Sequence, residues 1–123
     1  MRILIIIVGL FLLSAANGRA GQFLAGFEDV PLMPGIEMVV NSGVAFDSPA
    51  GRIIEAYATG MVTRKALQSY YQAALPQLGW TRSGSLQFNR AGERLTIELR
   101  GTSPVTARFA LGPAKTDKKI MQD

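Results

Sequence analysis

The spacing of hydrophobic and polar residues changes along the chain, from a period of 3.6 in the middle to a period of 2 near the end. In Arg94 to Arg100 apolar and polar residues alternate strictly, as expected of a half-buried strand. The segment from Val105 to Leu111 repeats this alternation. Short apolar segments bounded by turn residues predict further strands over 36–46, 53–59, 80–82 and 86–90.

The stretch from Met61 to Trp80 has the helical period instead. Apolar residues recur there at helical spacing, and Thr63 precedes them as a suitable N-cap. Pro76 has no N–H for a helical hydrogen bond, so the regular helix is expected to end near Ala74 or Leu75. The apolar stripe predicted to face the sheet comprises Leu67, Tyr71, Leu75 and Leu78.

These elements predict an α+β domain in which a single helix packs on an antiparallel sheet. The predicted order is ββαβββ, one strand fewer after the helix than the separate segments would give. The predicted domain spans 36–111, because the alternation stops at Gly112 and residues 112–123 read as a loose tail. One face of such a sheet is expected to remain exposed to water.

The N-terminal segment has the form of a secretory signal peptide. A short basic start is followed by an apolar run from Ile3 to Leu13 and then by small residues suited to cleavage after Ala16 or Ala20. The run is too short for a spanning helix. We therefore expect residues 1–20 to be removed and the product to be soluble in the periplasm or outside the cell, with membrane contact only through an uncleaved signal segment.

Residues 21–35 form an extended arm in this interpretation, because Pro31 and Pro34 disfavour a central strand. Its apolar residues are expected to pin it across the domain. The alternative is that Phe27, Leu32 and Met33 stay exposed as a contact for a partner.

The composition excludes several classes of catalytic and metal-binding site. The 123-residue chain contains neither Cys nor His, which excludes disulfides, thiol catalysis, a lipobox and the commonest general base and zinc ligand. No phosphate loop, dinucleotide fingerprint or nucleophile elbow is present. A hydrolase built on Asp47, Glu55 and Ser48 remains a minor alternative, but the chain is expected not to be an enzyme and to need no cofactor or metal.

Charge is unevenly distributed. The net charge of +4 falls to +2 without Arg2 and Arg19 of the export segment. Acidic residues predominate before Gly60 and basic ones after Met61, so the molecule is bipolar unless the two halves interleave in one sheet. The small net charge, export and the lack of an aromatic ladder argue against nucleic acid.

Two surfaces are candidate binding sites. If the last two strands pair, Arg94, Arg100 and Arg108 share one face, where forked donors suit carboxylate or phosphate groups; the simpler interpretation is a solvated face on which Glu98 pairs with an arginine. Tyr70, Tyr71 and Trp80 are the candidates for a pocket between helix and sheet, and the simpler interpretation is that they pack the core.

The spacing Tyr71-x(3)-Leu75-x(3)-Gly79-Trp80, followed by short strands, resembles the helix-on-sheet domains of the outer-membrane assembly lipoprotein BamC over about Ile53 to Leu111. With this spacing, residues 29–35 and Gly51-Arg52-Ile53, the chain is similar to an uncharacterised family of small exported proteobacterial proteins. The resemblance implies an α+β fold and no known activity. The expected function is a non-catalytic interaction module for an envelope protein or surface component, and the alternative is a small-ligand carrier.

Overall fold

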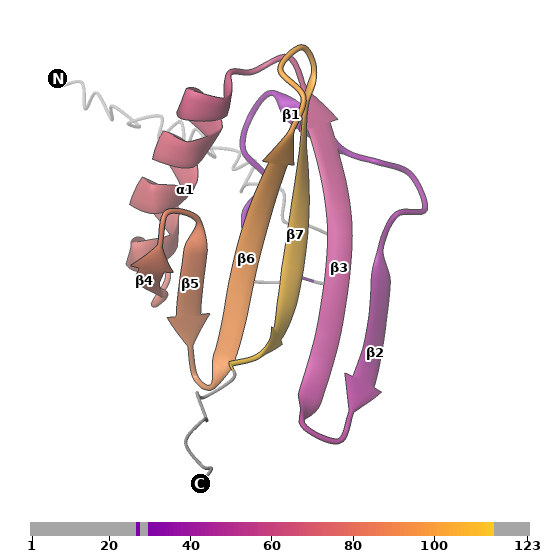
Figure 1. Ribbon diagram of the computed structural model, residues 1–123, viewed down its shortest axis with the longest axis vertical. Coiled ribbons are helices and arrows are strands. Elements are labelled where there is room, and N and C mark those ends of the chain that lie inside the picture. The colour runs from indigo at the N-terminus through magenta and orange to yellow at the C-terminus, as the bar shows by residue number, and fades with distance from the viewer. Residues whose placement is uncertain (1–26, 28–29, 115–123) are drawn as a thin grey trace, which may run out of the picture.

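The computed structural model describes residue 27 and residues 30–114 (Figure 1). The predicted signal peptide, part of the predicted arm (21–26 and 28–29) and residues 115–123 of the predicted tail lie outside this range. The described residues form one helix and a seven-stranded sheet. Along the chain, the elements are β1 (Ile36–Met38), β2 (Val44–Ser48), β3 (Gly51–Gly60), α1 (Arg64–Gln77), β4 (Thr81–Gly84), β5 (Gln87–Arg90), β6 (Glu93–Arg100) and β7 (Val105–Pro113).

The α+β class, with one helix on an antiparallel sheet, is confirmed, but the predicted order ββαβββ is wrong. Three strands precede the helix and four follow it. The strands lie in the order β1-β3-β7-β6-β5-β4, with β2 also paired to β3, and every pair is antiparallel. The tail prediction also began too early, because β7 continues to Pro113 and the Ala114 N–H donates to the Gly92 carbonyl at 2.8 Å.

The segment predicted as one strand over 36–46 is divided into β1 and β2. Met38 lies opposite Ala58 and Val44 lies opposite Glu55, so residues 39–43 have only two residues of β3 facing them. The Val39 N–H donates to the Tyr57 carbonyl at 2.8 Å, and the Tyr57 N–H donates to the Ser42 hydroxyl at 3.1 Å. The loop therefore leaves the sheet while β3 keeps its backbone hydrogen bonds.

The centre of the sheet joins the two halves of the chain. β3 pairs with β7, which places Ala56 opposite Phe109 and Ala58 opposite Ala107. Because β3 comes from the acidic half and β7 from the basic half, the charges of the two halves mix in one sheet. The stated exception, in which the two halves interleave in one sheet, is therefore the case that the structure shows.

The core lies between α1 and one face of the sheet. Alternating residues of the strands point to this face, and Leu67, Tyr71 and Leu75 of α1 are fully buried against them. Figure 1 shows α1 beside the end of the sheet formed by β4 and β5, on the opposite side of the molecule from β2. The sheet residues of this core include Ile54, Phe88, Leu95, Ile97, Phe109 and Leu111.

Both ends of α1 are closed by local hydrogen bonds. The Thr63 hydroxyl accepts from the Ala66 N–H at 2.9 Å, which confirms the predicted N-cap. At the other end, Gly79 at φ 95° lets the N–H of Trp80 reach the Leu75 carbonyl at 3.1 Å, as in a Schellman motif. The helix passes the predicted end and includes Pro76. Only its last turn is affected by the missing proline N–H, so the cost stays local.

Candidate functional site

The three arginines of the predicted surface share the face of the sheet that points away from α1. Glu98 lies opposite Arg108 and Arg100 lies opposite Thr106, since β6 and β7 pair in register. The Arg94 guanidinium donates to the Asn89 side-chain oxygen at 3.1 Å. Arg100 is exposed to solvent. We call these residues the arginine face.

Arg108, at the centre of the arginine face, is held by two carboxylates. Its guanidinium donates to Glu55 of β3 and forms an ion pair with Glu98 of β6 at 3.3 Å. The hydrogen bond with the Glu55 carboxylate raises the pKa of Arg108 above its usual value. The expectation that Glu98 pairs with an arginine is confirmed. Because Arg108 is already occupied, the arginine face has less charge to offer a ligand than the sequence suggested.

The apolar arm packs on the domain. Phe27 is buried, with its ring centroid 6.3 Å from that of Phe109 in an edge-to-face contact, while Leu32 and Met33 are half-buried against the core. The Tyr71 hydroxyl donates to the Pro31 carbonyl at 2.6 Å and accepts from the Met33 N–H at 3.1 Å. The interpretation of a pinned arm is confirmed for these residues. Phe27 is therefore not an exposed contact, whereas Leu32 and Met33 keep part of their surface exposed, and their role as a partner contact stays a prediction.

Tyr71 and Trp80 of the predicted pocket are core residues. Burial raises the pKa of Tyr71 well above the ordinary value of 10.0, because the phenolate would lie among apolar side chains. Trp80 is buried under the Arg90 guanidinium, whose carbon lies 4.5 Å from the ring centroid. The helix–sheet interface at these two residues is filled by protein side chains.

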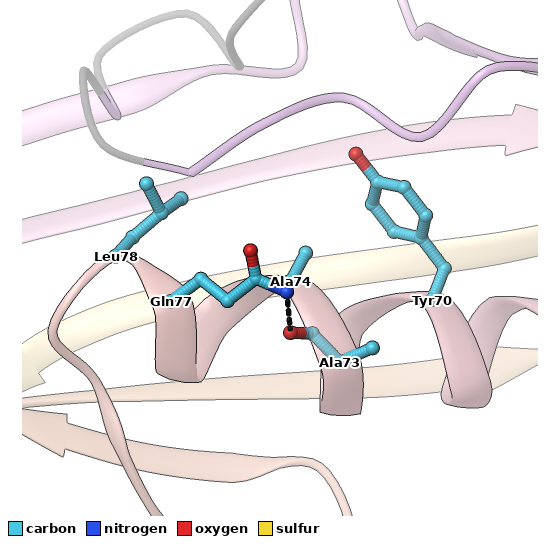
Figure 2. A pocket seen from close by; sticks show the side chains of 5 residues that line it. All are labelled: Tyr70, Ala73, Ala74, Gln77 and Leu78. Atoms are coloured by element: carbon cyan, nitrogen blue, oxygen red, sulfur yellow. Dashed lines mark hydrogen bonds between the residues drawn. The ribbon is translucent and has the colours of Figure 1, made fainter.

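Tyr70 lies apart, on the flank of α1. It lines a depression of about 340 Å³ with Ala73, Ala74, Gln77 and Leu78. Figure 2 shows the Tyr70 and Leu78 side chains rising from the two ends of this depression. The Gln77 amide donates to the Ala73 carbonyl at 3.2 Å along the helix. The depression is therefore on the outside of the helix and not between helix and sheet.

The β2 edge is an exposed apolar feature that sequence reasoning missed, and it holds four of the six exposed large hydrophobic residues among those described. We use this name for strand β2 and the loop 39–43 before it. Val44 and Phe46 are 51% and 55% exposed, and Val40 in the loop is 81% exposed. Across the part of the chain that the structure describes, β2 pairs only with β3. Its other edge therefore carries backbone groups with no strand beside them.

The opposite edge, β4, is built differently. Its residues Thr81, Arg82 and Ser83 are polar, and its pairing with β5 shifts register between Arg82 and Gly84. The Arg82 guanidinium donates to the Gly84 carbonyl at 2.9 Å. The Gln72 side chain of α1 also donates to the Ser85 carbonyl at 2.6 Å. Short length, polar side chains and a bulge are ways in which proteins prevent an edge strand from pairing further.

The sequence contained a signal for the β2 edge: the prediction over 36–46 took Gly43 as an interruption but did not divide the strand there. Asn41, Ser42 and Gly43 are turn residues in the middle of the predicted strand 36–46. Asn41 has a φ of 60°, which ends the extended conformation there. The exposure of Val44 and Phe46 was not visible, because a strand's apolar positions are expected to face the core.

The residues of the hydrolase alternative make structural contacts. Glu55 is bonded to Arg108, and the Ser48 hydroxyl donates to the Gly51 carbonyl at 2.6 Å across the β2–β3 turn. Asp47 lies opposite Arg52 in the register of β2 and β3. Within residue 27 and residues 30–114, no group of three or more acidic side chains is arranged to hold a metal ion.

No protein-family model, curated protein or solved structure matches the chain. The resemblance to the BamC domains therefore stays a prediction. None of the described segments forms a helix with the length and hydropathy needed to cross a membrane. A functional interpretation must be argued from the surfaces of the molecule.

Proposed function

We propose that this protein is an exported, non-catalytic interaction module that binds a protein partner in the cell envelope through its β2 edge. The observation that carries the proposal is the exposure of Val44 and Phe46 on a strand that has no neighbour on its outer side among residue 27 and residues 30–114. Export rests on the signal-peptide pattern of residues 1–20. An envelope role also agrees with the resemblance to the BamC domains.

Strand addition is the binding mode that suits this edge. An extended segment placed beside β2 would form backbone hydrogen bonds with its free groups, and alternate side chains would contact Val44 and Phe46. Lysines, prolines and bulges normally protect such edges from pairing. In β2 itself the only charged residue is Asp47. The β2 edge thus has the chemistry of a docking strand for an apolar extended segment.

The arginine face is a weaker candidate contact. Arg94 and Arg100 lie on the same side of the sheet as Val44 and Phe46, because opposite residues of paired strands point to one face. Acidic side chains of a bound partner that extend across the sheet would meet them. We expect these arginines to affect the rate of association more than the affinity.

Site-specific photo-crosslinking in living cells tests the proposal. A photoreactive phenylalanine analogue at position 46 should give a discrete adduct with a protein, because that side chain would lie in the interface. The same analogue at position 81, on the β4 edge, is the matched control and should give none. Equal labelling at both positions, or no adduct at 46, would contradict the proposal. The mature N-terminus read from the same sample tests export.

A ligand carrier is the second candidate, favoured by the depression beside Tyr70. Filling the depression with Ala74→Leu should abolish binding of an apolar ligand while leaving the adduct at position 46 unchanged. Fluorescence of Trp80 upon addition of an apolar envelope extract measures this binding. An identical response in the wild-type protein and the Ala74→Leu variant would exclude this site.

A further inference from the structure

The β2 edge is complementary to itself. Resting on the proposed function, we propose that the partner is a second copy of this chain, which pairs its own β2 antiparallel to the first about a two-fold axis. Such an interface uses the same surface on both subunits. The inference depends on the register, on the opposite edge and on the loop beside β2.

The pairing register in which both copies make favourable side-chain contacts is centred on Ala45. It places Val44 opposite Phe46 of the partner subunit, twice, and Asp47 opposite Gly43 of the partner subunit. Cross-strand pairs of an aromatic and a β-branched residue are favourable, and like charges directly opposite each other are not. The two Asp47 carboxylates then lie four residues apart along the strands, about 13 Å. No other charged residue lies within β2.

Both large apolar residues of β2 also lie on one face, the face that points away from α1. Val44 and Phe46 are opposite Glu55 and Ile53, which places all four on the side of the sheet that points away from α1. In the pair of copies, the two Val44–Phe46 contacts would form one continuous apolar strip across the axis. Each of these side chains would be covered on the side that faces the partner strand.

The other edge of the sheet determines that the pairing closes as a dimer. A β2 strand that paired with β4 of the next copy would generate an open fibre, because the contact would be heterologous. The polar residues and the register shift of β4 oppose this pairing. Self-pairing of β2 meets neither obstacle, and it uses the edge of both copies at once.

The loop 39–43 lies beside this interface. Figure 1 shows it extending beyond the edge of the sheet between β1 and β2. It carries Val40, the most exposed large hydrophobic residue of the described chain.

Solution mass is the first test, made on the protein secreted by cells that express the full chain. A single five-residue strand pair is a small interface, so we expect the average mass to rise from one chain to two with concentration. Val44→Lys should keep the mass of one chain, because two lysines would crowd the axis. Thr81→Lys adds the same charge to the β4 edge and should dimerise like the wild type.

Disulfide trapping tests the register. The chain has no cysteine of its own, so each variant carries a single thiol. Residues directly opposite in an antiparallel pair have Cα atoms about 4.5–5.5 Å apart, within the range that a disulfide bridges. Ala45→Cys should therefore give a covalent dimer when oxidised by dissolved oxygen with a copper catalyst. Asp47→Cys is the matched control, and its thiols would lie about 13 Å apart. It should stay unlinked.

The outcomes separate this inference from the proposed function. A mass of one chain at every concentration up to about 1 mM, with no trapping at position 45, overturns the second copy as partner. If the photo-adduct at position 46 then contains a different protein, the β2 edge is still a docking strand. If that adduct is also absent, both proposals fail. A dimer that persists in Val44→Lys, or is trapped equally at position 47, overturns the β2 pairing.

Discussion

The two edges of the sheet differ in what covers them. At the β4 edge, α1 lies alongside, Gln72 donates to Ser85, and Arg90 donates to the Leu78 carbonyl at 2.9 Å. At the β2 edge, every residue from Gly43 to Asp47 is exposed. The first edge is joined to the core by side-chain contacts, and the second depends almost entirely on its pairing with β3.

The difference between the two edges indicates which residues stabilise the fold and which are available for binding. Residues beside the helix contribute buried apolar surface, which is the main stabilising term of a small domain. Residues of β2 contribute little buried surface, so they are available for a partner. Substitutions near the helix should therefore lower the free energy of unfolding, whereas substitutions on β2 should mainly change association.

The largest effect is expected for Leu75→Ala. Leu75 is fully buried in α1, and removing its side chain leaves a cavity that costs about 2–5 kcal/mol. Leu78→Ala, at the exposed end of the same helix, should cost much less because less surface is lost. Urea denaturation of both variants measures the difference. Equal costs would mean that the helix does not pack as described.

Gly60→Ala should cause the next largest loss of stability. It is compared with a second glycine near the same edge of the sheet. A Cβ at Gly60 would overlap the backbone of Gly35 and Ile36, where β1 begins, so we expect a cost of about 1–3 kcal/mol. Gly43→Ala is its control in the open loop, where a Cβ would meet nothing within 4 Å. Thermal unfolding should leave Gly43→Ala near the wild type. A loss of stability in that variant would show that the loop is packed.

Tyr71→Phe should cost about 1–3 kcal/mol, because it leaves the Pro31 carbonyl and the Met33 N–H without their partner. It should also change the response to alkali. Burial raises the pKa of Tyr71, so the unfolded chain loses this proton at a lower pH than the folded chain. The stability from this group is complete below pH 10 and is lost as the pH rises above it.

Denaturant titrations at a series of pH values measure this slope. The loss of stability above pH 10 should be smaller in Tyr71→Phe than in the wild type. Tyr70→Phe is the comparison on the neighbouring residue. Burial raises the pKa of Tyr70 too, but the shift of Tyr71 is larger, so Tyr70→Phe should reduce the alkaline loss of stability less than Tyr71→Phe does. An unchanged alkaline slope in Tyr71→Phe would assign the slope to other groups.

The smallest effect is expected for Val44→Thr. This isosteric change on β2 should alter the free energy of unfolding by less than about 0.5 kcal/mol, measured at a dilution where the chain is monomeric. The same change at buried Val105 should cost about 1–3 kcal/mol, because it places a hydroxyl in the core. Similar costs at both positions would contradict the difference between edge and core.

The sequence alone determined the elements whose residues are periodic or locally capped. The alternation in β6 and β7, the helical stripe, the Thr63 cap and the turn at Gly79 depend on neighbours a few residues away, so they are readable from spacing. The α+β class followed from these elements. The same reasoning ended the helix too early at Pro76, because a proline in a last turn disturbs few hydrogen bonds.

Only the tertiary structure decided which surfaces are free. The pairing of β3 with β7 brings Glu55 to Arg108 across 53 residues of chain, and no local pattern contains that distance. The same pairing places Phe109 of β7 against the Tyr71 ring, with ring centroids 5.4 Å apart, and among the described residues β2 pairs only with β3. Whether an apolar residue is core or contact depends on which strand lies beside it, and in this protein that is set by long-range strand pairing.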